Sequence, residues 1–392
     1  MNIDSLISQR AQQIQPSPIR KFFDLANATA GTVSLGIGEP DFVTPWHIRD
    51  AAMASLRAGE TAYTPNAGTM ELREAVAEYL YARFGLSYDP KTEIFITVGA
   101  SEALDLATRV LLNPGDEMLV PDPSYVSYAP GAVLAGGRSV SLPTYAEDGF
   151  ALRGDVLKAA ITDKSKALIL PYPNNPTGGI MTRPQLEELA KVLEGTNLPV
   201  ISDEIYGELT YSGDHASFAQ IPGMKERTIL ISGFSKAFAM TGWRLGFAAG
   251  DRRFIAPMLK IHQYVIMCAS TMSQAAATEA LRGYISGDFD DVQKMRKAYD
   301  ERRRYIYQRL NNMGLSCFEP RGAFYIFPCI RSTGLSSEAF AETLLKEEKV
   351  AVVPGNAFGP SGEGFVRCSY AASMKNITEA MDRMERFVKR HR

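Results

Sequence analysis

The sequence predicts an α/β protein in which a large, doubly wound, mainly parallel seven-stranded sheet is followed by a smaller α+β domain. The chain has 392 residues, 45% of them hydrophobic, which is enough for a large domain and a smaller one. Between residues 94 and 249, short apolar runs alternate with segments of helical periodicity. This alternation is typical of parallel sheets with helices on both faces. We therefore expect a large domain over residues 46–284 and a small domain that combines 1–45 with 285–392.

The individual elements follow from apolar periodicity and turn residues. Seven runs are expected to form the strands of the large sheet: 94–98, 118–120, 139–142, 166–170, 199–202, 228–232 and 245–249. Helices are expected before and between these strands, at 47–58, 71–84, 102–112, 125–135, 153–160 and 183–193. The rest is expected to contain helices at 252–266, 273–284, 289–310, 337–347 and 375–389, and short strands at 315–318, 324–327, 350–353 and 365–370. Right-handed crossovers place the carboxyl ends of parallel strands along one edge, where such sheets bind ligands.

Composition and charge exclude several classes of function. With 42 Lys and Arg against 44 Asp and Glu, the net charge is −2, which gives no basis for binding nucleic acid or an anionic membrane. No apolar stretch is long enough to span a bilayer, and the first residues lack the pattern of a signal peptide. The four cysteines and four histidines are scattered, so we expect a cytoplasmic protein with reduced cysteines and no metal site.

One lysine lies among apolar and aromatic residues in the sequence. Lys236 follows the apolar run 228–231 and a Ser-Gly turn, and it is surrounded in sequence by Phe234, Phe238, Met240 and Trp243. Lysine is strongly hydrated and is rarely placed among apolar residues without a partner or a reaction to perform. A desolvated lysine has a lowered pKa and becomes a nucleophilic amine, as Schiff-base chemistry requires. The alternative is a surface lysine at the rim of a loop.

Four further polar features fall at the ends of predicted strands, and each also has a purely structural explanation. Ala100 and Ser101 begin a helix and could bind an anion, or Ser101 could be an ordinary helix cap. Asn175 lies in a loop of turn-forming residues, 171–179, which could simply connect two elements. Asp203 follows a buried strand and needs a cationic partner unless it caps a helix. Arg244 suits a phosphate or carboxylate, or a structural salt bridge.

Taken together, these residues match one cofactor. They supply an amine nucleophile, a buried carboxylate, a phenol at Tyr206, a carboxamide, an arginine and an anion-binding helix start. Pyridoxal 5′-phosphate (PLP) has the complementary groups: an aldehyde, a protonated ring nitrogen, a ring hydroxyl and a phosphate. The combination therefore favours a PLP enzyme over the separate structural explanations.

The sequence strongly resembles the class I aminotransferases of PLP fold type I, particularly their prokaryotic gamma-type subgroup. The resemblance is carried, in collinear order over nearly the whole chain, by residues 174–178, 202–206, 235–246, 320–325 and 366–369. It implies a homodimer with shared active sites and a ping-pong Schiff-base mechanism. One departure is Gly233, where some relatives have a serine that binds phosphate, so this contact passes to Ser235.

The resemblance also implies a role for each site residue. It implies that Lys236 is the catalytic residue that forms the Schiff base, and that Asp203 pairs with the ring nitrogen. The other implied cofactor-binding residues are Asn175 and Tyr206 at the ring hydroxyl, Tyr125 stacked on the ring, Ala100, Ser101, Ser235 and Arg244 at the phosphate, and Tyr63 from the neighbouring subunit. The implied substrate-binding residues are Arg367, which binds the α-carboxylate, with Asn175 and the backbone of Gly38.

The sequence says less about the side chain of the substrate than about the cofactor. An N-terminal arm over residues 1–30 and two later aromatic residues suggest an apolar, aromatic or long L-amino acid: Ile19, Phe22, Phe23, Tyr128 and Phe324. Residues 260–277 contain no arginine, and Ser101 stands where some aspartate-specific relatives have a lysine, although Arg20 could still meet a distal carboxylate. Relatives acting on aromatic amino acids, alanine and N-acetyl-diaminopimelate share residues 99–104, so the donor stays open. The expected acceptor is a 2-oxo acid, by default 2-oxoglutarate.

Two other functions are compatible with parts of this pattern. A PLP-dependent carbon–sulfur β-lyase would use the same cofactor-binding residues, and release of pyruvate and thiol from cystathionine would reveal it. A transcription regulator would carry a winged-helix DNA-binding domain before this fold, but this sequence shows neither such a segment nor a basic patch. The sequence therefore predicts an enzyme whose partners are small molecules, with no nucleic acid or membrane.

Overall fold

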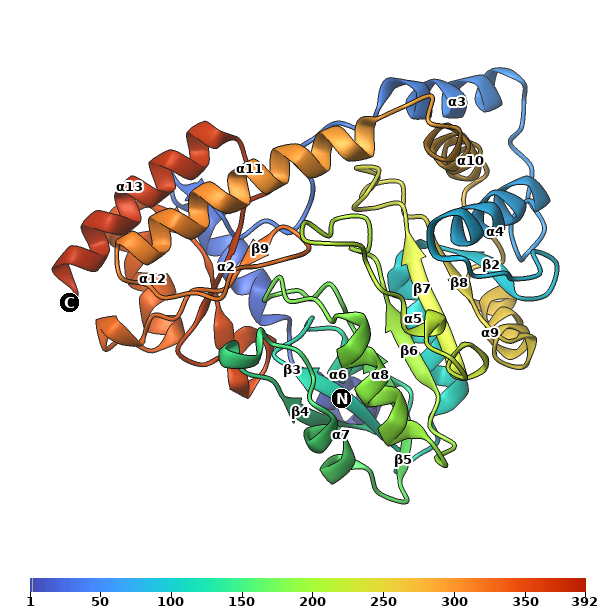
Figure 1. Cartoon of the computed structure of the whole chain (residues 1–392), viewed down its shortest axis with the longest axis horizontal. Helices are drawn as coiled ribbons and strands as arrows, with labels where there is room; N and C mark the ends of the chain where they lie inside the picture. The colour runs from blue at the N-terminus through green and yellow to red at the C-terminus, as the bar shows by residue number, and fades with distance from the viewer. Residues whose placement is uncertain (2) are drawn as a thin grey trace.

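The computed structural model describes residue 1 and residues 3–392, and it has two lobes connected by the long helix α11 (Asp291–Asn312) (Figure 1). The larger lobe contains a seven-stranded sheet in the order β2-β8-β7-β6-β5-β3-β4. Its strands are β2 (Ile94–Thr97), β3 (Glu117–Asp122), β4 (Arg138–Pro143), β5 (Ser165–Leu170), β6 (Val200–Asp203), β7 (Thr228–Gly233) and β8 (Gly246–Ala249). They lie where the apolar runs predicted them, so the α/β fold class with a mainly parallel sheet is confirmed.

One strand of the sheet runs against the others. β8 pairs antiparallel with both β2 and β7, whereas β3 to β7 are parallel to one another. Gly246, the first residue of β8, lies opposite Gly233, the last residue of β7. Because of this reversal, the residues just before β8 reach the same edge as the residues just after β6 and β7.

Both faces of the sheet are covered by helices because successive strand residues point to opposite sides. Phe95, Ile169 and Ile229 pack with α5 (Gly99–Leu111), α6 (Tyr128–Leu134) and α9 (Arg252–Val265). Ile96 and Leu230 face the other layer. That layer consists of α4 (Met70–Phe84), α7 (Gly154–Ala160), α8 (Arg183–Leu193) and α10 (Thr271–Ser286), with α3 (Trp46–Arg57) outside α10.

The smaller lobe combines both ends of the chain. β1 (Val33–Ser34) pairs with β10 (Val350–Ala351), and β11 (Val353–Pro354), β12 (Val366–Ser369) and β9 (Tyr325–Ile326) form a second small sheet. Its helices are α2 (Pro18–Ala28), α11, α12 (Ser337–Glu348) and α13 (Met374–Arg390), and α1 (Gln9–Gln13) precedes them. Phe22 of α2 is buried in the same core as residues of α11 and α13. The domain boundaries at 45/46 and 284/285 stay a prediction.

Two details of the smaller lobe correct the sequence analysis. The strand predicted at 315–318 is wrong: this segment has no regular structure, and its Ser316 carbonyl accepts an isolated hydrogen bond from the N–H of Cys329. The strand predicted at 350–353 is divided between β10 and β11, which belong to different sheets. Short apolar segments of this kind pair according to their tertiary neighbours, which periodicity does not reveal.

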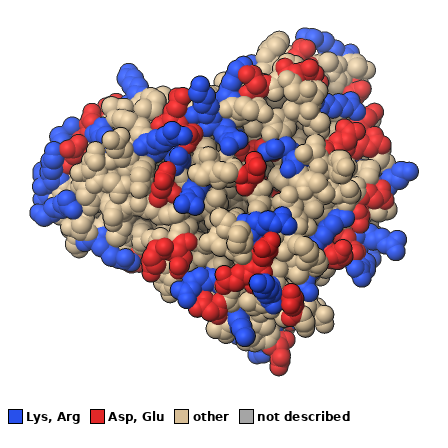
Figure 2. Space-filling view, viewed as in Figure 1, with Lys and Arg blue, Asp and Glu red and all other residues tan. Residues whose placement is uncertain are grey.

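The surface carries both signs of charge. On the face shown in Figure 2, Lys and Arg are interspersed with Asp and Glu over both lobes. Within residue 1 and residues 3–392, none of the helices combines the length and the apolar character needed to cross a membrane.

Candidate active site

A cavity of about 420 Å³ lies at the carboxyl edge of the large sheet and is closed on one side by the smaller lobe. Every site residue predicted from the sequence except Tyr63 lines it: Gly38, Ala100, Ser101, Tyr125, Asn175, Asp203, Tyr206, Ser235, Lys236, Arg244 and Arg367. The reversed direction of β8 and the folding of the smaller lobe against the sheet bring these distant segments together. Tyr63 is 81% exposed and lies outside this cavity.

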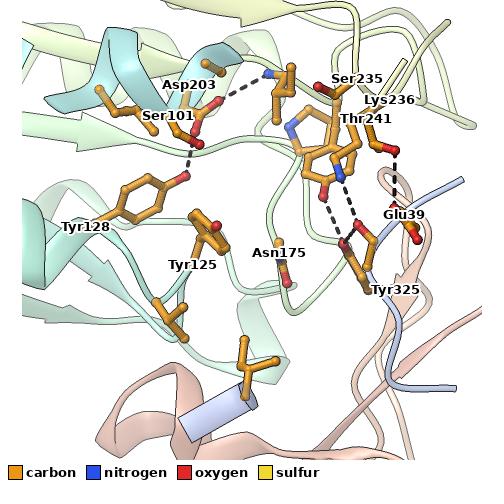
Figure 3. Close-up of a pocket in the computed structure, with 18 of the residues that line it drawn as sticks. Glu39, Ser101, Tyr125, Tyr128, Asn175, Asp203, Ser235, Lys236, Thr241 and Tyr325 are labelled. Carbon is orange, nitrogen blue, oxygen red and sulfur yellow. Dashed lines mark hydrogen bonds between the residues drawn. The ribbon is translucent and has the colours of Figure 1, made fainter. Parts of the chain in front are cut away.

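Lys236 projects into the cavity from the loop after β7 (Figure 3). Its Nζ donates a hydrogen bond to the carbonyl of Gly38 at 2.8 Å and lies 5.7 Å from the ring centres of both Tyr206 and Phe324. The apolar neighbours of Lys236 in sequence do not surround its ammonium group. Phe234, Phe238 and Met240 are instead buried in the core of the larger lobe, where they anchor the loop that carries the lysine.

The environment of Lys236 favours the neutral amine. Burial lowers the pKa of Lys236 to about 8; the charge of Glu39 opposes this shift, and those of Arg367 and Arg244 add to it. Some of its surface faces the cavity, but protein atoms surround it on the other sides. With a pKa of about 8, about a tenth of the amine is neutral at pH 7. This is the property required of a nucleophile and proton acceptor.

Asp203 ends β6 and is almost fully buried. Its Oδ2 accepts a hydrogen bond from Tyr128 Oη at 2.8 Å, and its Oδ1 accepts one from the N–H of Ile205 at 3.3 Å (Figure 3). Burial raises the pKa of Asp203 to about 6, although both hydrogen bonds act in the opposite direction. A positively charged group in the cavity would lower this pKa again and hold the carboxylate in its charged form.

Arg367 of β12 is fully buried and forms the base of the cavity. Its Nη1 donates to Asn175 Oδ1 at 2.9 Å, and its Nη2 donates to the carbonyl of Gly36 at 2.6 Å. The guanidinium carbon lies 4.5 Å from the ring centre of Tyr325. Its Nε is buried and has no hydrogen-bond partner among the described residues. This donor-rich arrangement suits a carboxylate ligand.

A phenol pair connects the two sides of the site. Tyr206 Oη and Tyr325 Oη are 2.9 Å apart, and Tyr325 also donates to the carbonyl of Gly38 at 3.4 Å. Burial, together with the neighbouring Tyr325, raises the pKa of Tyr206 well above its ordinary value. Position 38 requires glycine because a Cβ there would lie 2.8 Å from Tyr325 Oη. Because Tyr325 donates its O–H to the Gly38 carbonyl, Tyr206 is the donor to Tyr325, and burial keeps Tyr206 protonated.

The start of α5 and Arg244 together offer hydrogen-bond donors and positive charge that suit an anion. Helix α5 begins at Gly99, so the N–H groups of its first residues have no partner within the helix. Arg244 lies directly over this start: a Cβ at Gly99 would be 2.7 Å from Arg244 Nη2. Arg244 has a left-handed backbone with φ of 52°, a conformation that costs a non-glycine residue about 1 kcal/mol. Ser235 lines the same cavity.

Several residues of the site were not predicted from the sequence, or were predicted in another role. Tyr128 was expected near the substrate side chain, but it is the hydrogen-bond donor to Asp203. Phe22 and Phe324 are buried in the core of the smaller lobe, and Arg20 is exposed and paired with Asp24 at 3.3 Å. The lining residues that were not predicted include three with side chains able to form hydrogen bonds: Glu39, Thr241 and Tyr325. In the sequence, the one indication of these residues is that they lie within motifs that were selected because of other residues.

Comparison with known proteins agrees with this geometry. The family model "Aminotransferase class I and II" matches residues 30–384. The chain belongs to this family. It is 48% identical to aromatic-amino-acid aminotransferase 2 of Thermococcus litoralis and 49% identical to an aspartate aminotransferase of Pyrococcus abyssi, in each case over 98% of both chains. The solved structure of an aromatic aminotransferase from Pyrococcus horikoshii is 50% identical, covers 94% of this chain and 99% of its own, and superposes with a TM-score of 0.90.

The chain is therefore a PLP-dependent aminotransferase of fold type I. Transamination is supported over the β-lyase alternative because the family and these relatives are aminotransferases. The cavity also has the chemistry that PLP needs. It combines a buried carboxylate at Asp203, a buried phenol at Tyr206, an amine at Lys236, and a helix start with an arginine over it.

Proposed function

We propose that this aminotransferase moves the amino group of an L-amino acid with an apolar, aromatic or long side chain to a 2-oxo acid, with 2-oxoglutarate as the acceptor. The observation that supports this class of amino donor is the apolar wall of the cavity. Ile19 and Phe23 of α2 and Val126 line it, whereas Arg20 points elsewhere and pairs with Asp24. In this chain Arg367 is bound to Asn175 and Gly36, which suits it to the α-carboxylate shared by all amino acids.

The proposed roles of the cofactor-binding residues follow from their chemistry. Asp203, held by Tyr128, would pair with the ring nitrogen, and Asn175 and Tyr206 would hold the ring hydroxyl. Tyr125 would stack on the ring. The phosphate would be bound by the four residues at the helix start and the neighbouring loops: Ala100, Ser101, Ser235 and Arg244. When bound, PLP withdraws electrons from Cα of the amino acid, which makes the Cα–H bond acidic.

The residues of the chain then position the substrate and move its proton. Arg367 and Asn175 orient the α-carboxylate, so that the Cα–H bond faces Lys236; this is positioning catalysis. Lys236 Nζ, whose burial favours the neutral amine, removes the proton from Cα and, as a general acid, would deliver it to the aldehyde carbon of the cofactor. Ile19 and Phe23 cover the side chain and exclude water. The substrate α-amino group is retained on the enzyme until a 2-oxo acid accepts it, which gives ping-pong kinetics.

The two relatives compared above are named for different amino donors. One is named an aromatic-amino-acid aminotransferase and another an aspartate aminotransferase, at nearly equal identity. Our proposal rests on the lining of this cavity rather than on either name. An apolar wall favours an apolar side chain because a second carboxylate placed there would be desolvated without a partner.

The test is a panel of amino donors, including phenylalanine, tyrosine, leucine, alanine and aspartate, each with 2-oxoglutarate, pyruvate or oxaloacetate as acceptor. We expect the highest kcat/KM for phenylalanine or tyrosine with 2-oxoglutarate. Phe23→Ala should lower kcat/KM for these donors about tenfold and leave alanine nearly unchanged. Leu25→Ala, at an exposed position of the same helix that does not line the cavity, is the matched control. Aspartate as the best donor would overturn the proposal.

We also propose that the active enzyme is a homodimer in which Tyr63 completes the partner's phosphate site. Tyr63 is 81% exposed in the single chain, and a group of exposed apolar residues lies at the end of α9 and directly after it: Tyr264, Val265, Ile266 and Met267. Exposed apolar residues gathered at one place are typical of interfaces.

Sedimentation should give twice the chain mass. Mixing inactive Lys236→Ala with Tyr63→Ala chains should restore activity, because one site of the mixed dimer is then intact. A monomer with full activity would contradict this.

A further inference from the structure

The start of α5 is held by a buried pair that does not line the cavity. Glu102, in the first turn of α5, contacts His262 of α9 through Oε1 and Nδ1, which are 2.7 Å apart. His262 has no exposed surface, and the side chain of Glu102 is 12% exposed. Neither residue lines the active-site cavity, and neither has a part in the proposed reaction.

The second oxygen of Glu102 determines where the helix begins. Its Oε2 accepts a hydrogen bond from the N–H of Val98 at 2.6 Å, and no other side chain caps α5. Val98 is the residue just before the helix. Glu102 thus satisfies the N–H that precedes the helix and leaves the N–H groups of Ala100 and Ser101 available to an anion.

His262 holds Glu102 in this orientation. A carboxylate only accepts hydrogen bonds, so the Nδ1–H of His262 is the donor. The other ring nitrogen, Nε2, is buried and has no hydrogen-bond partner among the described residues, and the ring packs edge to face against Phe95 of β2 at 5.7 Å. The ring is therefore locked between the sheet and α9, and its one polar contact is with Glu102.

We propose that Glu102 and His262 are positioning residues for the cofactor phosphate. A carboxylate so close to an anion site repels the anion, so its presence is unfavourable unless it performs another task. The task that the geometry supports is to fix Val98, and with it the direction of the N–H groups at the start of α5. The inference rests on the proposed function, in which Ala100 and Ser101 bind the phosphate.

The test compares PLP with pyridoxal, which lacks the phosphate. Each full-length variant is purified as holoenzyme, stripped of cofactor and titrated with each compound, with binding followed by absorbance. Glu102→Met and His262→Leu are expected to bind PLP about tenfold more weakly, as for the loss of one charge-assisted hydrogen bond, with pyridoxal affinity unchanged. His262→Asn, whose carboxamide N–H can occupy the place of Nδ1–H, should recover most of the PLP affinity.

Two further variants make the result decisive. His215→Leu is the matched control, because His215 and Glu204 form another buried pair, at 2.8 Å, away from α5; its ratio of PLP to pyridoxal affinity should not change. Arg244→Gln is the reference for the phosphate site and should lower that ratio. If Arg244→Gln lowers it and Glu102→Met does not, the positioning proposal is overturned and the proposed function stands. If Arg244→Gln also has no effect, the phosphate assignment fails and this proposal with it.

The proposal can still be tested if one of the variants does not fold. If His262→Leu is unstable, Glu102→Met, which keeps the side-chain volume close to that of glutamate, and His262→Asn, which keeps an N–H donor toward Glu102, decide the question. Equal losses of PLP and pyridoxal affinity in Glu102→Met would indicate a general structural role and would contradict the proposal.

Discussion

Replacing Lys236 by alanine is expected to lower kcat by at least about 10⁴-fold. The variant loses the amine that lies between Tyr206 and Phe324 and bonds to the carbonyl of Gly38. No other lysine lines the cavity among the described residues. One change therefore removes both the nucleophile and the group that moves the Cα proton.

The measurement is the exchange of the Cα hydrogen of a donor with solvent, together with steady-state turnover. PLP should remain bound to the variant because the residues proposed to hold its phosphate and ring are unchanged. Lys260→Ala, an exposed lysine of α9, is the control and should be fully active. Turnover of Lys236→Ala within tenfold of the unmodified enzyme would exclude the proposed role.

Arg367→Leu is expected to reduce kcat/KM for amino acids about 10³-fold, because the substrate carboxylate would then be buried without a charged partner. The change also leaves Asn175 Oδ1 and the carbonyl of Gly36 without their donor. Arg367→Lys keeps the charge but lacks the planar fork of donors, so we expect an intermediate loss.

An amine substrate that has no carboxylate distinguishes a loss of carboxylate binding from a loss of folding. If Arg367 binds the α-carboxylate, benzylamine should react at a similar low rate with Arg367→Leu and with the unmodified enzyme. Arg331→Leu, which changes an exposed arginine of the same lobe, is the control and should retain its kcat/KM. A melting temperature close to that of the unmodified enzyme would show that the loss is not one of stability. An unchanged kcat/KM for amino acids would remove Arg367 from the substrate site.

The active site illustrates where sequence reasoning succeeds. Asp203 was selected because it directly follows a buried strand, and Lys236 because of the apolar residues near it in sequence; a charged residue in either place is costly without a purpose. The strands of the large sheet were found because a strand buried on both faces has a continuous apolar pattern. Both features depend on residues close together in the chain, so they can be recognised from the sequence alone.

Contacts between distant segments were not predictable in the same way. The bond from Tyr128 to Asp203 joins residues 75 positions apart, and the bond from Arg367 to the carbonyl of Gly36 joins residues 331 apart. No pattern of periodicity indicates which tyrosine will meet a given carboxylate. For the same reason Tyr128 was expected beside the substrate, and the segment 315–318 was expected to be a strand.

By itself, the sequence determined the α/β fold class, the cofactor and the types of residue that line the cavity, because these depend on residue type and on apolar pattern. Only the tertiary structure decided that β8 runs against its neighbours, which brings Arg244 over the start of α5. It also decided that Glu102 is held by His262 rather than facing solvent. The physical reason is the same in both cases: strand direction and side-chain partners are set by packing between elements that lie far apart in the chain.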